Sequence, residues 1–198
     1  LQYQIGAALE RYCMRHVRNY VTVSSGLQRI LADEFEIPKE RIGLAPNAID
    51  LDRFANLDRQ KQALIKKYPT FDFQNSGKYI VFVGIMREWA GVQFLIQAFA
   101  KISPRFPDYK LLLVGGGGDK PLFEEMCRNF AISEKVIFTD AMPYADIPGF
   151  ISLARIACAP FPSSKVTDQK QLMSPLKVLE YMAAGKAVLA SGVGGMEN

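Results

Sequence analysis

From residue 78 to the end of the chain, short apolar runs alternate with longer segments in which apolar residues recur every three or four positions. The apolar runs are Tyr79–Val83, Leu111–Val114, Val136–Phe138, Ile156–Ala159 and Ala187–Ala190. They are rich in β-forming residues and show no polar alternation, which is typical of strands buried on both faces of a parallel sheet. The longer segments predict helices over Val92–Ile102, Asp119–Phe130, Ile147–Ala154 and Ser174–Gly185. Five strands with four intervening helices predict an α/β fold with a doubly wound parallel sheet.

The last predicted helix carries the most specific pattern in the chain. Ser174 suits the N-cap, Pro175 the first helical position and Gly185 the left-handed residue that ends the helix. The residues between them leave almost no polar face, so we expect this helix to be buried. Lys177 and Glu180 are the two charges that interrupt the apolar pattern.

These two charges allow two interpretations. Lys177 lies in the first turn, where the helix dipole disfavours a cation unless an anion such as phosphate docks there. Glu180 has apolar neighbours on both sides, and a buried carboxylate needs polar partners. The alternative is that the two side chains, three residues apart, pair with each other. The pattern alone does not favour either.

The first part of the chain has a different organisation. Residues 1–46 predict two helices and two short strands, which is too little sheet to stand alone. We therefore expect them to be the tail end of another domain. Residues 47–77 contain a turn, a charged helix and a polar loop, and they predict a linker. Because the chain begins at Leu1 and not at a methionine, we expect a fragment of a longer protein.

Composition narrows the class of protein. The chain has 198 residues, of which 49% are hydrophobic and 22% charged, as in an ordinary globular protein. The net charge of +4 is spread along the chain, which does not indicate binding to nucleic acid. Cys13, Cys127 and Cys158 lack metal-ligand spacing and predict free thiols in a reducing compartment. We see no membrane-spanning or signal segment and no cluster of metal ligands.

The loops that follow the predicted strands are rich in small residues. Gly84 follows the first strand, Gly115–Gly118 the second, and glycines recur after the fifth. In doubly wound sheets ligands bind beyond the carboxyl ends of the strands, and glycine lets backbone N–H groups approach them. Neither GxGxxG nor GxxxxGK[ST] is present, so neither a dinucleotide fingerprint nor a P-loop is predicted. The edge as a whole points to a phosphate-bearing ligand such as a nucleotide.

Several segments, in order, make the chain similar to a known family. They are VTVSSGLQRIL, APNAIDLDRF, YIVFVGIMREWAGVQFLIQAFAKI, LLLVGGGG, KVIFTDAMPYADIP, IACAPFP and SPLKVLEYMAAGKAVLASGVGGMEN. The chain resembles the retaining nucleotide-sugar glycosyltransferases of glycosyltransferase family 4, which share the two-domain GT-B fold. The resemblance implies that residues 1–46 end a Rossmann-like acceptor domain and that 47–77 form the interdomain linker and first donor-domain helix. Residues 78–198 would be a Rossmann-like domain that binds the nucleotide sugar and is truncated at its C-terminus.

The resemblance also implies the roles of individual residues. Glu180 matches the second glutamate of the family's Glu-x7-Glu motif, which holds the donor ribose. The residues implied at the donor phosphates are Ser174, Pro175 and Leu176, and the glycine-rich strand ends add Gly84, Gly115 and Gly116 as candidates. Those implied at the nucleobase are Thr139, Asp140, Ala141 and Met142, and those at the donor sugar are Gly194, Gly195 and Glu197.

The sequence departs from the family pattern at three positions. The first glutamate of the motif would fall at Leu172, and the family's arginine and lysine of the first donor loop would fall at Ile85 and Ala90. Those cations neutralise the departing diphosphate in the family, and that charge must be stabilised. We expect Arg87 and Lys177 to substitute and to be catalytic together with Glu180. A solvated surface charge is the alternative for Arg87.

The resemblance implies a hexosyltransferase that moves a sugar from a nucleoside diphosphate sugar to a glycan or lipid-linked acceptor, with retention of configuration. It implies no cofactor and no metal, since the sugar nucleotide is a co-substrate. We expect a cytoplasmic protein, peripheral to the inner face of a membrane, and no transfer by this chain alone. Two alternatives stay open: a non-catalytic glycosyltransferase-like binding module, and a GT-B relative such as a nucleotide-sugar epimerase or a phosphorylase. The single histidine, His16, weakens the epimerase alternative.

Overall fold

The computed structural model describes residues 2–69, 71, 73, 76–162 and 174–192. These residues fall into two compact units. The amino-terminal unit runs to Asn47 and also contains Ser174, Pro175 and Gly192. The sheet unit contains Ala48–Pro162 and Leu176–Ser191.

The described residues of the amino-terminal unit form two helices and a pair of parallel strands. Its elements are α1 (Gln2–His16), β1 (Tyr20–Thr22), α2 (Ser25–Asp33), the 3-10 turn η1 (Lys39–Arg41) and β2 (Ile42–Leu44). Ser24 is the N-cap of α2, and its hydroxyl accepts a hydrogen bond from the backbone N–H of Leu27. Leu31, Ile37 and Ile42 form a small core of this unit.

The sheet unit is built on five parallel strands in the order β5-β4-β3-β6-β7. The strands are β3 (Tyr79–Val83), β4 (Lys110–Val114), β5 (Val136–Phe138), β6 (Ala154–Ala159) and β7 (Ala187–Ala190). The helices are α3 (Leu57–Lys67), α4 (Val92–Ile102), α5 (Lys120–Asn129), α6 (Ile147–Ser152) and α8 (Leu176–Ala183), with 3-10 turns η2 (Leu51–Phe54), η3 (Glu88–Ala90), η4 (Ser133–Lys135) and η5 (Tyr144–Asp146). The predicted doubly wound α/β sheet is confirmed.

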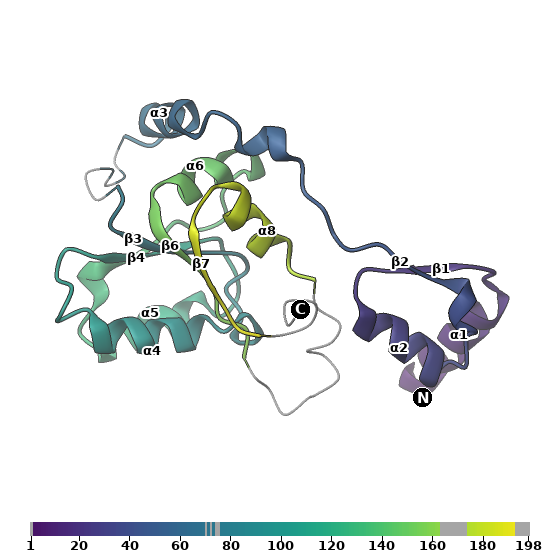
Figure 1. The fold of residues 1–198 in the computed structure, drawn as a ribbon. Helices are drawn as coiled ribbons and strands as arrows, with labels where there is room; N and C mark the ends of the chain where they lie inside the picture. Colours follow the sequence, from purple (N-terminus) through teal and green to yellow (C-terminus); the bar gives the residue numbers. More distant parts are fainter. Residues whose placement is uncertain (1, 70, 72, 74–75, 163–173, 193–198) are drawn as a thin grey trace. The chain divides into compact units, whose positions relative to one another are not determined.

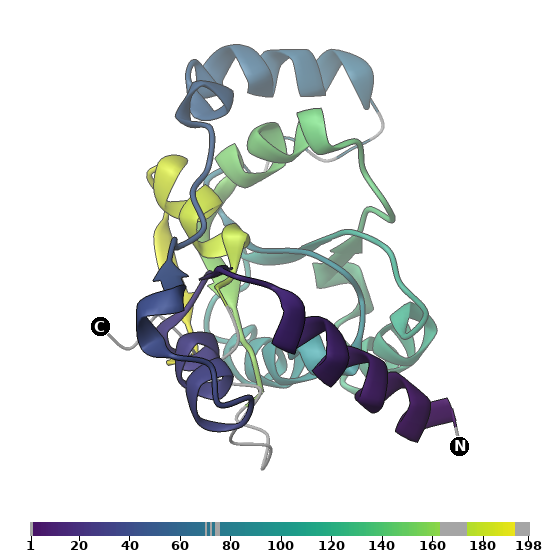
Figure 2. The ribbon, with the colours of Figure 1, turned by 90° about the vertical axis from the view of Figure 1, so that its right-hand side faces the viewer.

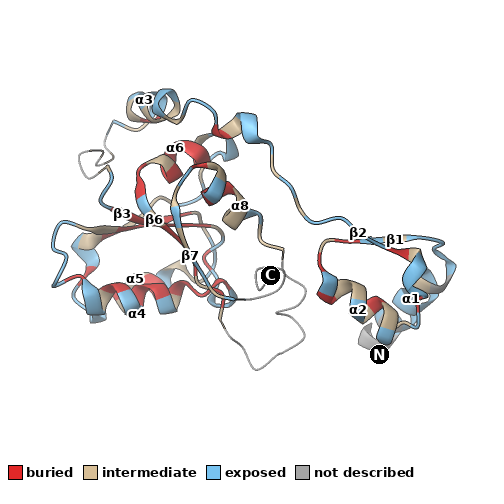
Figure 3. Ribbon diagram, viewed as in Figure 1, coloured by how far each residue is buried: buried red, intermediate tan, exposed pale blue. Residues whose placement is uncertain are grey.

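Helices cover both faces of this sheet. Figure 1 shows α4 and α5 on one face and α3, α6 and α8 on the other, and Figure 2 shows α3 lying over α6. Every residue of β3 is buried because this strand is central and covered on both faces, whereas most of β7 is exposed at the edge (Figure 3). The continuous apolar run of β3 is thus explained by its place in the sheet.

Two details of the predicted helices are wrong. The helix predicted over Ile147–Ala154 ends at Ser152, and Ala154 already pairs with β3. The helix predicted to be buried is α8, yet Leu176 and Met182 are exposed. Helix α8 packs on β6, β7 and η2, and these contacts leave Leu176 and Met182 in solvent.

The sheet opens where its strand order reverses, between β3 and β6. These strands pair only from Tyr79 to Val81 on β3. Beyond that point the hydroxyl of Tyr181, a fully buried residue of α8, accepts from the N–H of Val83 (2.8 Å) and donates to the carbonyl of Cys158 (3.4 Å). The hydroxyl replaces direct strand pairing, so the carboxyl ends of β3 and β6 stay apart. In doubly wound sheets this is the place where ligands bind.

Candidate functional site

The ammonium group of Lys177 lies at the reversal point of the sheet, that is, where the strand order reverses between the ends of β3 and β6. Its Nζ lies 4.2 Å from the centroid of the Phe82 ring at the end of β3, and 5.3 Å from that of Phe161, just after β6. A Cβ on Gly84 would stand 2.6 Å from Nζ, so the absence of a side chain at Gly84 makes room for the ammonium group. Burial lowers the pKa of Lys177 to about 8, although the charge of Glu180 acts in the opposite direction.

No carboxylate or hydrogen-bond acceptor of the described residues contacts this ammonium group, which lies over aromatic faces instead. A half-buried cation without an anionic partner, in the first turn of a helix, is well placed to meet an anion. Lys177 is therefore the candidate phosphate contact of this edge.

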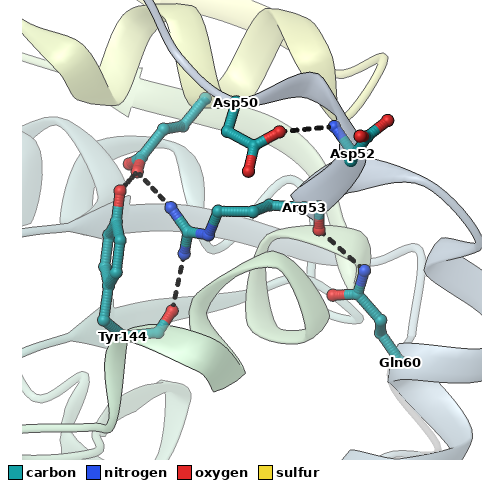
Figure 4. A network of polar contacts seen from close by, with 6 residues as sticks. Asp50, Asp52, Arg53, Gln60 and Tyr144 are labelled. Atoms are coloured by element: carbon teal, nitrogen blue, oxygen red, sulfur yellow. Dashed lines mark hydrogen bonds and ion pairs between the residues drawn. The ribbon is translucent and has the colours of Figure 1, made fainter.

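Glu180 does not pair with Lys177, because its partners lie elsewhere. The carboxylate is buried, and its Oε1 accepts a hydrogen bond from the Tyr144 hydroxyl at 3.0 Å. Nη1 of Arg53 lies 3.9 Å from the same oxygen, and the guanidinium stacks on the Tyr144 ring with Cζ 3.5 Å from its centroid (Figure 4). The expectation that a buried Glu180 has polar partners is confirmed, and the alternative of a pair with Lys177 is wrong.

The predicted phosphate loops lie against each other. A Cβ on Gly115 would stand 2.0 Å from the carbonyl oxygen of Gly84, and the φ of Gly115 is +135°. The N–H of Met86 donates to Gly116 O at 2.8 Å, which ties the two loops together. The N–H of Gly84 donates to Val114 O and that of Gly115 to the hydroxyl of Thr139, so both N–H groups are already used in hydrogen bonds within the fold.

The structure brings the predicted nucleobase loop next to these glycines. Gly115 and Asp140 form an isolated bridge, and Asp140 has a φ of +60°. The Asp140 carboxylate bonds to the Lys120 ammonium, which raises the pKa of that lysine. A Cβ on Gly116 would lie 3.3 Å from the backbone nitrogen of Ala141. Ala141 is exposed and Met142 is half-buried, so both remain accessible beside the glycines.

Arg87 is held by a partner that the sequence did not reveal. Its Nη1 bonds to Asp119 Oδ1 at 3.1 Å, while Asp119 Oδ2 accepts from the N–H of Glu88 at 2.9 Å. Asp119 directly precedes α5, but its side chain makes no cap hydrogen bond there because both oxygens are engaged with the loop that follows β3. Arg87 is about half exposed, so its guanidinium lies at the surface beside the glycine run, where Gly118 leaves space for it.

Some of the remaining candidate positions are described by the structure and others are not. Ile85 is exposed and Ala90 is buried in the core, so neither supplies a cation. Ser174 and Pro175 precede α8, which begins at Leu176. Leu172, Gly194, Gly195 and Glu197 lie outside the described residues.

The described ranges hold neither a metal-binding cluster nor a membrane-spanning helix. No group of three or more His, Cys, Asp or Glu side chains there is arranged to hold a metal ion. No helix in the same ranges has the length and apolar character needed to cross a membrane.

Comparison with known proteins identifies the family. Residues 77–198, more than half of the chain, match the family described as glycosyl transferases group 1. The chain belongs to this family. The resemblance to glycosyltransferase family 4 is thereby confirmed, and with it the GT-B type of fold.

Two curated relatives of this group 1 glycosyltransferase chain are informative. The 2-deoxystreptamine glucosyltransferase of Streptomyces kanamyceticus is 25% identical over 196 residues, which is 99% of this chain and 48% of the relative. The phosphatidyl-myo-inositol mannosyltransferase of Mycobacterium tuberculosis is 30% identical over 147 residues, which is 74% of this chain and 34% of the relative. The chain thus spans less than half the length of these relatives.

A solved structure supports the fold. Anabaena Alr3699/HepE in complex with UDP-glucose superimposes with a TM-score of 0.68 at 18% identity. The match covers 91% of this group 1 chain and 46% of the Anabaena chain.

Proposed function

We propose that this chain is the donor-binding part of a retaining glycosyltransferase. The intact enzyme transfers a sugar, of the hexosyl type, from a nucleoside diphosphate sugar to a glycan or lipid-linked acceptor. The observation that carries this proposal is Lys177, whose ammonium group lies without an anionic partner among the described residues at the reversal point of the sheet. Family membership supports the reaction class.

We assign a role to each part of the site. Lys177 and the start of α8, with the Gly84, Gly115 and Gly116 loops, receive the diphosphate. Glu180 accepts hydrogen bonds from the ribose hydroxyls, and the main chain of Thr139–Met142 contacts the nucleobase. Gly194, Gly195 and Glu197 are proposed at the donor sugar.

The chemistry requires charge stabilisation at the leaving group. As the bond between the sugar and the diphosphate breaks, negative charge grows on the phosphate oxygen that departs. A fixed ammonium group in a partly desolvated setting stabilises this charge strongly, because the local dielectric constant is low. Lys177 supplies that charge where Ile85 and Ala90 cannot, and Arg87 adds a second positive charge at the rim. No metal ion is required in this proposal.

The relatives support the classes of donor and acceptor. The Anabaena protein is described in complex with UDP-glucose. One curated relative is named as a glucosyltransferase that acts on 2-deoxystreptamine, and another as a mannosyltransferase that acts on phosphatidyl-myo-inositol. We therefore propose a nucleotide-sugar donor and an acceptor that is a glycan or is linked to a lipid.

The proposal extends to organisation and location. Residues 1–46 are assigned to the end of the acceptor domain, 47–77 to the linker and 78–198 to the donor domain. Because the acceptor would be held by a part that this chain lacks, the chain alone binds donor but does not transfer sugar. The net charge of +4 supports a peripheral position at an acidic inner membrane surface of the cytoplasm.

A non-catalytic binding module is the second candidate. The observation that favours it is the pair Ile85 and Ala90, since one is an exposed apolar residue and the other lies in the core. A module of this kind would bind a nucleotide sugar at the same edge without supporting turnover.

Calorimetric titration of the chain with UDP, GDP and ADP tests the proposed site. We expect saturable binding of one of them, weakened at least tenfold by Glu180→Gln. Glutamine keeps an acceptor for Tyr144 and preserves the volume, so the loss would report the missing charge and not a cavity. Failure of the folded chain to bind any of the three would contradict the proposal. Transfer by a longer chain that includes the acceptor domain would separate the enzyme from the binding module.

A further inference from the structure

The partners of Glu180 come from two segments far away in the sequence. Arg53 belongs to η2, and Tyr144 begins η5. Arg53 bridges these segments, because Nη2 donates to the carbonyl of Tyr144 at 2.9 Å while Nη1 faces Glu180. All three residues belong to the sheet unit.

Both contacts fall on one oxygen of the carboxylate. Oε1 receives the Tyr144 hydroxyl and faces Arg53, whereas Oε2 has no hydrogen bond to any residue that the structure describes. Oε2 is not one of the fully enclosed atoms that lack a partner among the described residues, so it still reaches solvent and its acceptor positions are open to a ligand. Oε2 is therefore the oxygen with unused capacity to accept hydrogen bonds from a ligand.

The arginine is itself held in place. The side chain of Asp50 accepts from the N–H of Asp52 and begins the turn of η2, and Gln60 Nε2 donates to the carbonyl of Arg53 at 2.7 Å (Figure 4). Gln60 Nε2 also donates to the carbonyl of Ala55 at 2.9 Å. The stacked Tyr144 ring fixes the plane of the guanidinium group. The η2 turn, the Tyr144 ring and the Glu180 carboxylate are therefore linked through Arg53, and rotation of the Glu180 side chain would break several contacts.

We infer that Arg53 and Tyr144 are positioning residues that hold Oε1 of Glu180 and thereby present Oε2 to vicinal hydroxyls of a ligand. They make the site selective for a ribonucleotide over the same nucleotide without ribose hydroxyls. This inference rests on the proposed function, in which Glu180 binds the donor ribose. Neither residue needs to touch the donor itself.

The test compares a ribonucleoside diphosphate with its 2′,3′-dideoxy counterpart, by calorimetry on the same chain. The pair is taken from UDP, GDP or ADP, whichever binds the unaltered chain. The ratio of the two dissociation constants measures the ribose preference. The variants are Tyr144→Phe, which keeps the ring that stacks on Arg53 but removes the hydroxyl, and Arg53→Gln.

A matched control is available in the same unit. Tyr68 donates to the Asp146 carboxylate at 2.6 Å, so Tyr68→Phe also removes a tyrosine–carboxylate hydrogen bond on η5, but one that does not involve Glu180. Circular dichroism and urea unfolding establish that each variant is folded. If Arg53→Gln fails to fold, Tyr144→Phe decides alone.

We expect Tyr144→Phe and Arg53→Gln to lower the ribose preference about tenfold, as for loss of a hydrogen bond to a charged group, with little change for the dideoxy ligand. Tyr68→Phe should leave the preference unchanged. An equal loss for both ligands, or an unchanged preference, would overturn the inference and leave the proposed donor site intact. Binding without any ribose preference in the unaltered chain would refute the role of Glu180 and the inference with it. Absence of all diphosphate binding would refute the proposed function as well.

Discussion

Lys177 should make the unliganded chain less stable, and this can be measured. Replacing it by methionine, in Lys177→Met, keeps an unbranched side chain over the Phe82 and Phe161 rings and removes the charge. The pKa of Lys177 is lowered from its usual 10.5 to about 8, mainly by burial. That difference corresponds to about 3 kcal/mol of disfavoured charge, which we reduce to about 2 kcal/mol because the residue keeps some solvent contact.

The size of this destabilisation by Lys177 depends on pH. Below pH 8 the lysine is charged in both the folded and the unfolded chain, so the folded chain bears the full penalty. Between pH 8 and 10.5 the unfolded chain binds the proton that the folded chain has released, and the contribution of Lys177 to stability rises with pH. Above 10.5 both states are neutral and the penalty is gone. Lys177→Met should therefore be about 2 kcal/mol more stable at pH 7, with most of this gain lost by pH 10.

The measurement is the free energy of unfolding in urea, at pH 7 and pH 10, of the unaltered chain and of Lys177→Met. Lys78→Met is the control, because Lys78 is exposed and its Nζ pairs with the Asp108 carboxylate at 3.0 Å, so its removal deletes an ion pair and relieves no buried charge. We expect that variant to be no more stable than the unaltered chain at either pH. The reasoning is refuted if Lys177→Met is less stable at pH 7, or if its gain is the same at both pH values. A gain independent of pH would come from methionine packing and not from the charge.

The same variant should weaken nucleoside diphosphate binding, and so stability and affinity should change in opposite directions. A hydrogen bond between an ammonium group and a phosphate contributes about 1.5–3 kcal/mol, or at least a tenfold change in dissociation constant. Affinity of the unaltered chain should fall as pH rises above 8, when Lys177 loses its proton. Calorimetric titration at pH 7 and pH 9 checks both expectations.

Two further substitutions test the structure around the site, each by urea unfolding. Tyr181→Phe should lower the free energy of unfolding by about 2 kcal/mol, because it leaves the buried N–H of Val83 and the carbonyl of Cys158 without their shared partner. A loss below about 0.5 kcal/mol would contradict the bridging role of the hydroxyl. Gly115→Ala should lower the free energy of unfolding by about 3 kcal/mol or more, because the new Cβ would overlap the Gly84 carbonyl. Gly185→Ala is the control: Gly185 has a φ of +64° and no atom within 4 Å of the added Cβ, so this change should cost only about 1 kcal/mol. Similar losses in the two variants would argue against close contact of the two loops.

Much of the fold could be predicted because each pattern reflects its own position in the sheet. Tyr79–Val83, Val92–Ile102 and Ala187–Ala190 were predicted with the bounds that the structure gives. A strand buried on both faces needs a continuous apolar run, and this requirement is local. Helix α8 was predicted in place, but its exposed Met182 was not, because an apolar residue at the surface leaves no signal in the sequence.

The partners in the site were harder to predict, since they come from distant segments. The need of Glu180 for polar contacts could be inferred from its apolar neighbours. The identity of those contacts could not, because Arg53 and Tyr144 reach it from η2 and η5. Arg87 shows the same difficulty, since its partner Asp119 lies 32 residues further along the chain, at the start of α5. Chain topology, and not local propensity, decides such pairs.

The Tyr181 hydroxyl has a consequence for ligand affinity. Because the end groups of β3 and β6 already bond to it, an arriving ligand has no strand pairing to break. The free energy of holding the strands apart is included in folding and is not subtracted from binding, which is the advantage of pre-organisation. A fully buried residue that donates nothing to the ligand thus contributes to how tightly it is held.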